Sequence, residues 1–207
     1  MAETLWVLGI GAQSRGDLAR ATTLHEESLA LRRGRGDERG AAQVLSALAQ
    51  VALHRRDLPG ARAMVAEALV TLRRLDDRWG QAMALALLGH VELVAGDLVC
   101  AWAYLGEAAA LYTALGNLLY LPWCLEGLAG VMVAWDRVAD AARLMGAREA
   151  LLERLGPGLP LAGPAGYART LATARTALGD VAFAAAHEAG RALPPDAAIA
   201  GAVGDGA

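Results

Sequence analysis

Leucines recur at a fixed 40-residue spacing in this chain of 207 residues, and this spacing constrains the fold more than any other feature. One set is Leu5, Leu45, Leu85 and Leu125, and a second set, three residues later, is Leu8, Leu48, Leu88 and Leu128. An interval of this size is typical of proteins that stack one supersecondary unit on the next, so that a continuous core forms between units. The period therefore predicts a helical repeat array.

Each 40-residue unit is predicted to contain two helices. Ala and Leu dominate and aromatic residues make up only 5% of the chain, a composition that favours helix over strand. First helices are expected at 2–14, 39–55, 79–95 and 119–135, and second helices at 18–34, 58–75, 98–115 and 138–155. Asp17, Asp57 and Asp97 stand in the turns within units, where an aspartate caps the next helix by accepting its free N–H groups.

Residues 1–156 thus form four predicted helix pairs, and residues 157–207 form a second region. Pro157, Pro160 and Pro164 indicate a loop. Beyond it, Tyr167 and Leu178 lie on one face of a predicted helix, and a further short helix starts near residue 181. Because a repeat array needs its last apolar face covered, these segments are predicted to be capping helices. The Gly-rich end, after about residue 203, is predicted to be a disordered tail.

The repeat positions resemble the tetratricopeptide repeat in its longer form, of roughly 40 residues. The resemblance covers about 3–156 and rests on Leu88-Gly89, then Gly96-Asp97-Leu98, then Ala101 and Ala108. Segments such as 16–21, 141–147 and 174–179 look like the sensor region of large bacterial transcriptional regulators, the maltose-regulator-like and signal-transduction ATPases. The resemblance implies an all-α, right-handed superhelix of helix hairpins. In that family the repeats follow an ATPase module, often with a helix-turn-helix, and this sequence contains neither.

In tetratricopeptide arrays the first helix of each pair lines the concave face, so the resemblance also assigns groove positions. In this sequence they are occupied by Trp6, Gln13, Gln43, Ser46, Gln50, His54, Met83, His90, Trp123 and Glu126. Amides, imidazoles, two tryptophans and one acid suit an uncharged peptide or a small effector, whereas a clamp for carboxylates would need Lys or Arg facing inward. Met83 is equally compatible with packing between helices.

The sequence predicts no catalytic, cofactor or metal site. All 19 basic residues are Arg, which excludes chemistry that needs a lysine amine. Ser14 stands where a dinucleotide-binding loop beginning at Gly9 would need its third glycine. The segment around Ser14 also lacks the first glycine of a nucleophile elbow and the strand that should precede it. The four histidines, His25, His54, His90 and His187, show no metal-binding spacing.

Composition also limits the partners and the compartment. The net charge is −3 and no basic cluster is present, so no nucleic-acid surface is predicted. Cys100 and Cys124 are too few for a disulfide framework, and no signal peptide or apolar stretch of transmembrane length occurs. We therefore expect a cytoplasmic protein with no membrane contact.

Together these patterns predict a non-catalytic protein-interaction or ligand-sensing module of a bacterial transcriptional regulator. Two alternatives stay open: a free-standing scaffold that self-associates, and a helical enzyme that uses His54, His90 and Glu126. Because the sequence starts with the first helix of a repeat, an apolar face near Leu5 and Trp6 is predicted to be uncovered. That face predicts a weak homodimer through the N-terminal helix.

Overall fold

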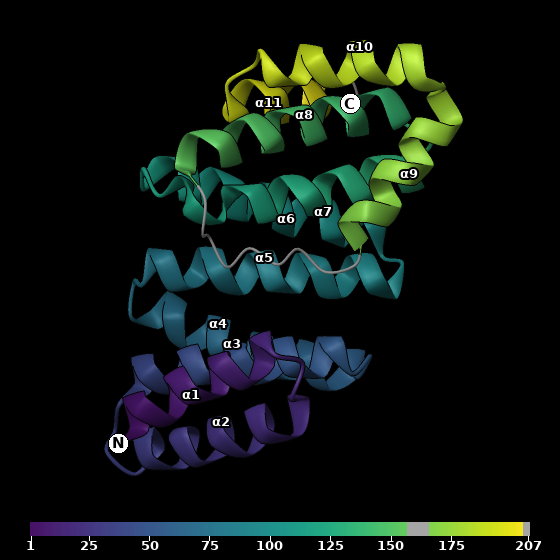
Figure 1. The fold of residues 1–207 in the computed structure, drawn as a ribbon. Coiled ribbons are helices and arrows are strands. Elements are labelled where there is room, and N and C mark those ends of the chain that lie inside the picture. The colour runs from purple at the N-terminus through teal and green to yellow at the C-terminus, as the bar shows by residue number, and fades with distance from the viewer. Residues whose placement is uncertain (157–165, 205–207) are drawn as a thin grey trace. The chain divides into compact units, whose positions relative to one another are not determined.

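The computed structural model describes residues 1–156 and 166–204, and every regular element in those ranges is helical (Figure 1). The all-α fold and the packing of successive helices confirm the predicted fold class. The elements are α1 (Ala2–Ser14), α2 (Leu18–Arg33), α3 (Glu38–His54), α4 (Leu58–Arg74), α5 (Arg78–Ala95), α6 (Leu98–Ala114), the 3-10 helix η1 (Leu118–Tyr120), α7 (Leu121–Ala134), α8 (Val138–Leu155), α9 (Gly166–Leu178), α10 (Asp180–Arg191) and α11 (Pro195–Gly204).

Each turn that joins the first eight α-helices, and also the end of α8, contains a residue with positive φ, and these residues follow at a 20-residue step. A residue with positive φ occurs at Gly16, Gly36, Arg56, Asp76, Gly96, Gly116, Asp136 and Gly156. Glycine adopts this left-handed conformation without steric cost, whereas Arg56, with φ at 64°, does not. The aspartate after five of these residues caps the next helix, and three of the five caps lie within the predicted repeat units: Asp17, Asp57 and Asp97 accept the backbone N–H of Arg20, Gly60 and Cys100. These predicted N-caps are therefore confirmed.

The chain divides into two compact units, Met1–Ala95 and Gly96–Ala207. In the first unit each helix packs on the next, and α3 also contacts α1 and α5. The repeat leucines Leu45 and Leu48 are buried in α3, as predicted. Leu8 differs, because half of its surface (50%) is exposed. Within this unit α1 packs mainly against α2, and its contact with α3 is small, which agrees with the exposure of Leu8.

In the second unit the C-terminal helices pack on α7 and α8. Both α10 and α11 contact α8, and α9 contacts both α7 and α8. Ala142, Ala174 and Phe183 form the apolar cluster between α8, α9 and α10, which agrees with the predicted capping role. The predicted loop at 157–165 and residues 205–207 of the predicted tail lie outside the described residues, whereas Val203 and Gly204 belong to α11.

Two glycines allow α8 and α10 to approach each other closely. A β-carbon on Gly146 of α8 would overlap the carbonyl of His187, and one on Gly190 of α10 would overlap the carbonyl of Arg143. Each helix therefore has a glycine opposite the backbone of the other, and both must lack a side chain for this contact.

Among all the described helices, none combines the length and apolarity that a membrane span requires.

Candidate functional site

Eight of the ten predicted groove residues lie in the first unit, on α1, α3 and α5. Because α3 contacts both neighbouring first helices, its accessible side chains stand at the centre of this row. Four of them are spaced by four, three and four residues, which places them on one helical face. We call this face the α3 stripe; it consists of Gln43, Ala47, Gln50 and His54, of which the first three are half-buried and the last is exposed.

The polar groups of the α3 stripe are available for contacts. Among the residues that the structure describes, the side-chain amides of Gln43 and Gln50 make no hydrogen bond. His54 Nδ1 lies 2.8 Å from the backbone oxygen of Gln50. Since a carbonyl only accepts, Nδ1 carries the proton and Nε2 is left as an acceptor. The stripe therefore offers amide donors and acceptors and one imidazole acceptor, with no carboxylate or guanidinium.

Other predicted residues are less accessible than the stripe. Ser46 is buried and donates its hydroxyl to the carbonyl oxygen of Ala42, at 3.1 Å, within its own helix. His90 is also buried, with 5% of its surface exposed. Gln13 and Met83 are half-buried on α1 and α5, beside α3. Ser46 and His90 thus serve the packed interior, and the accessible part of the row is Gln13, the α3 stripe and Met83, together with the half-buried Trp6.

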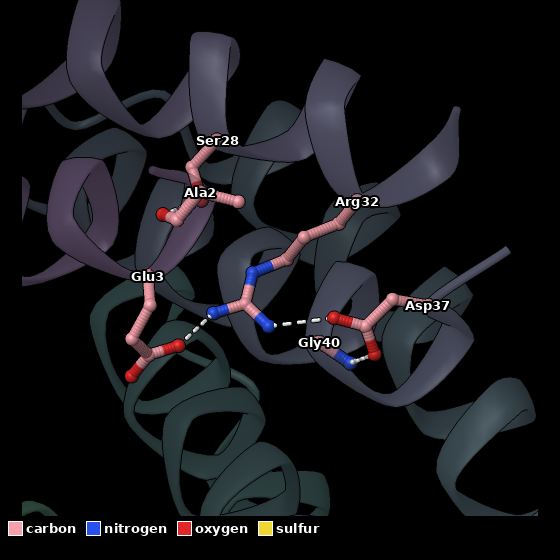
Figure 2. Close-up of polar contacts among 6 residues, drawn as sticks. All are labelled: Ala2, Glu3, Ser28, Arg32, Asp37 and Gly40. Atoms are coloured by element: carbon pink, nitrogen blue, oxygen red, sulfur yellow. Dashed lines mark hydrogen bonds and ion pairs between the residues drawn. The ribbon is translucent and has the colours of Figure 1, made fainter. Parts of the chain in front are cut away.

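Trp6, at the α1 end of this row, borders a buried guanidinium that no sequence motif predicted. Arg32 on α2 lies 6.0 Å from the centre of the Trp6 ring and is 7% exposed. Figure 2 shows its two ion pairs, one with Glu3 on α1 and one with Asp37, 2.8 Å away before α3. A β-carbon on Gly40 would overlap the guanidinium, so this glycine makes room for it.

Asp37 completes this contact by also capping α3. Its second carboxylate oxygen accepts the backbone N–H of Gly40 at 2.9 Å. The Gly40 N–H and the guanidinium of Arg32 together hold the pKa of Asp37 below its usual value. Arg32 thus joins α1, α2 and the N-terminal cap of α3 and lies beside Trp6. We interpret this cluster as structural support for the row, because each of its charges already has a partner.

The remaining two predicted residues, Trp123 and Glu126, lie on α7 in the second unit. Trp123 is half-buried, whereas Glu126 is 5% exposed. Glu126 Oε2 is 3.2 Å from the Arg148 guanidinium on α8. Burial raises the pKa of Glu126 to about 7, although the positive charge of Arg148 acts in the opposite direction. Glu126 is therefore an interior group and not a surface contact for a ligand.

Arg148 connects Glu126 to a chain of polar contacts across α7, α8, α9 and α10. Its guanidinium lies 3.9 Å from the centre of the Tyr167 ring. The Tyr167 hydroxyl donates to Glu149 at 2.6 Å, and His187 Nε2 lies 3.2 Å from the other oxygen of Glu149. We call these five residues the α8 network. It ties the C-terminal helices to α7 and α8, and no sequence motif pointed to it.

The candidate nucleophiles are poorly placed for chemistry. Cys124 is fully buried, and burial raises the pKa of its thiol to about 12, so it is neutral at physiological pH. Ser14 donates its hydroxyl to the Gly11 carbonyl at 3.0 Å. In residues 1–156 and 166–204 no group of three or more His, Cys, Asp or Glu side chains is arranged to hold a metal ion. Neither Cys124 nor Ser14 is thus positioned as an activated nucleophile.

Comparison with known proteins supports the fold alone. No family model and no curated protein matches the sequence. Among solved structures, the chain is similar to BtubC (BKLC) from P. vanneervenii, with a TM-score of 0.66 and 21% sequence identity. The match covers 99% of this chain and 81% of the other. The class that the fold defines is therefore an all-α protein with repeat-like packing of adjacent helices.

Proposed function

We propose that this chain is a non-catalytic protein-interaction module whose α3 stripe binds an extended, largely uncharged peptide of a protein partner. The observation that carries the proposal is the pair of half-buried amides, Gln43 and Gln50, which lack hydrogen-bond partners among the described residues. A half-buried amide has lost part of its hydration, and a peptide backbone restores both its donor and its acceptor contacts. The absence of charged side chains from the stripe disfavours a strongly charged ligand.

A peptide library displayed on phage tests this proposal with the full chain as bait. Selected peptides should lose at least about tenfold in affinity, close to 1.4 kcal/mol, when Gln43 and Gln50 are both changed to Ala. Glu27→Ala, at an exposed position on α2, is the control and should leave affinity unchanged. Peptides that bind the wild-type chain and the double variant equally well would contradict the proposal. A thermal shift with small metabolites but no peptide binder would favour the small effector instead.

We further propose that the module belongs to a cytoplasmic bacterial transcriptional regulator of the tetratricopeptide type. Support comes from the segments 16–21, 141–147 and 174–179, which resemble the sensor region of such regulators. In this proposal the chain itself contacts neither nucleic acid nor membrane. Sequencing the gene and its flanks tests it, since a P-loop ATPase or helix-turn-helix encoded in the same reading frame is expected. A reading frame without either module would contradict it.

Self-association through α1 is a second candidate, favoured by an exposed apolar cluster. Val7, Leu8 and Ile10 are 54%, 50% and 44% exposed. Leu8 is a repeat leucine, and its counterpart Leu48 is only 8% exposed, so this face is of the kind that a helix covers elsewhere. The occupant we propose is α1 of a second copy. Its one acidic residue, Glu3, is already paired with Arg32, so two such faces meet without repulsion between like charges.

Sedimentation velocity over a concentration series tests this candidate. A weak dimer should form in the wild-type chain and be lost in Leu8→Glu. Val70→Glu is the matched control, because Val70 on α4 is also exposed, at 69%, but lies on a different helix. A monomer at all concentrations, or equal loss of the dimer in both variants, would contradict self-association through α1.

A further inference from the structure

His25 lies in the middle of α2, and its imidazole is completely buried. None of its surface is exposed, and neither Nδ1 nor Nε2 has a hydrogen-bond partner among the described residues. The ring faces α1, where a β-carbon on Gly9 would overlap it. Gly9 therefore provides the space that the ring occupies, and the closeness of α1 seals the imidazole from water.

The charged groups of the surrounding helices do not compensate a proton on His25. On α1 the only acidic side chain, Glu3, is paired with Arg32. Arg32 itself lies seven residues after His25 on the same face of α2 and adds positive charge. The other charged groups of α2 and α3 are exposed or engaged elsewhere: Arg20, Glu26 and Glu27 are exposed, Arg33 pairs with Glu67, Glu38 with Arg74, Arg39 with Asp77, and His54 bonds the backbone of Gln50.

An imidazolium in this position would be a buried charge with neither a hydrogen bond nor a counter-ion, which is costly. Burial accordingly lowers the pKa of His25. His25 binds the proton more readily when the chain is unfolded, or when α1 has detached from α2, than when the two helices are packed together. The contribution of His25 to stability is therefore fully present at high pH and is lost as the pH falls below the ordinary histidine value of about 6.5.

We propose that His25 makes the docking of α1 on α2 pH-dependent, so that α1 detaches under mildly acidic conditions while α2 to α5 stay packed. Detachment of α1 hydrates the imidazolium and breaks the contacts that α1 makes with α2 and α3, whereas the contacts among α2 to α5 remain. Gly16, with φ at 78° and no atom near the place of a β-carbon, is the hinge between the two helices. The function of α1 in this proposal is that of a pH-sensitive cover.

Polar contacts between α1 and α2 hold the two helices together at the N-terminal turn of α1, and these contacts oppose its detachment. Ser28 donates to the carbonyl oxygen of Ala2 at 2.8 Å, and Arg32 pairs with Glu3 (Figure 2). From Gly9 onward α1 is held on α2 by apolar contacts, such as Ala12 with Ala21. Protonation of His25 acts at this second half of α1, which is next to the hinge.

Hydrogen exchange measured by mass spectrometry tests the proposal in the full chain, at pH values from about 7.5 to about 5. After correction for intrinsic exchange, the opening constant of α1 should rise by up to about tenfold per pH unit below about 6.5, as expected for one linked proton. The opening constant of α3 should stay constant. His25→Leu should abolish the rise in α1, whereas His54→Leu, at an exposed histidine, should preserve it.

Two results would overturn the proposal. One is an α1 opening constant that does not change with pH in the wild-type chain, and the other is an unchanged rise in His25→Leu. If that variant does not fold, the wild-type chain still decides the matter by NMR. His25 must then titrate below the ordinary histidine value of about 6.5, and titration of His25 at or above that value would also refute the proposal.

Discussion

The close contact of α8 and α10 predicts that one substitution, Gly to Ala, has opposite effects at two helical positions. In α6, a β-carbon on Gly106 meets nothing within 4 Å, so Gly106→Ala should stabilise the chain by about 0.5–1 kcal/mol through helix propensity. At Gly146 the new β-carbon overlaps the backbone of α10. Overpacking of this kind costs about 1–3 kcal/mol, so Gly146→Ala should destabilise by about 1–2 kcal/mol net.

Chemical unfolding followed by circular dichroism measures the sign of both changes. Because repeat proteins unfold in parts, hydrogen exchange of α10 should accompany it. Gly146→Ala is expected to speed exchange in α10 and to lower the melting temperature by roughly 2–4 °C per kcal/mol, whereas Gly106→Ala should raise the temperature. Gly190→Ala should act like Gly146→Ala, and the double variant should cost less than their sum because the two share one contact.

A Gly146→Ala variant that is as stabilised as Gly106→Ala would contradict this prediction. That result would mean that α8 and α10 are further apart than the two glycines indicate. Slower exchange in α10 of Gly146→Ala would lead to the same conclusion, since it would show that an added methyl group strengthens the contact.

Three further outcomes are expected. Arg56→Gly should raise the free energy of unfolding by about 0.5–1 kcal/mol because it removes a left-handed non-glycine residue. Arg15→Gly, at φ −89°, should not raise it, and equal effects of the two substitutions would contradict the prediction. Glu126 has a pKa of about 7 against the usual 4.5, so the folded chain loses stability as this group loses its proton. The free energy of unfolding should therefore fall by up to about 3 kcal/mol between about pH 5 and pH 8. Glu126→Gln should show a smaller fall, and a pH profile identical to that of the wild-type chain would exclude Glu126 as its origin. Leu48→Ala should cost about 2–5 kcal/mol and the exposed Leu8→Ala well under 1, as urea titrations can show; similar costs would mean that Leu8 is covered.

Helices and turns were the part of the fold that could best be predicted from the sequence, because they depend on local chemistry. The caps at Asp17, Asp57 and Asp97 each require one side chain and one backbone N–H three residues later. The first helix of the fourth pair was less accurate: it was expected from residue 119, but α7 begins at Leu121 after a 3-10 turn capped by Asn117. Pro122 lies in the first turn of α7, where the missing N–H costs little.

The candidate site could only partly be predicted from the sequence, because periodicity specifies a helical face but not which other residues cover it. Gln43, Gln50 and His54 lie at accessible positions, as expected for a face that a ligand contacts. Ser46 occupies a nearby position on α3, yet its hydroxyl is bonded within the helix. Glu126 faces Arg148, which is 22 residues later in the sequence, and no local pattern predicts a contact of that separation.

The 20-residue step of the left-handed turns also determines how such a chain can change in length. Duplication or deletion of 40 residues keeps each positive-φ residue in a turn and each capping aspartate in front of a helix. An insertion of another length within a helix moves the next Gly or Asp out of register with its neighbours. Gene duplication in whole repeats is therefore the tolerated route to a longer array, whereas single-residue insertions within the helices α1 to α8 should be disfavoured.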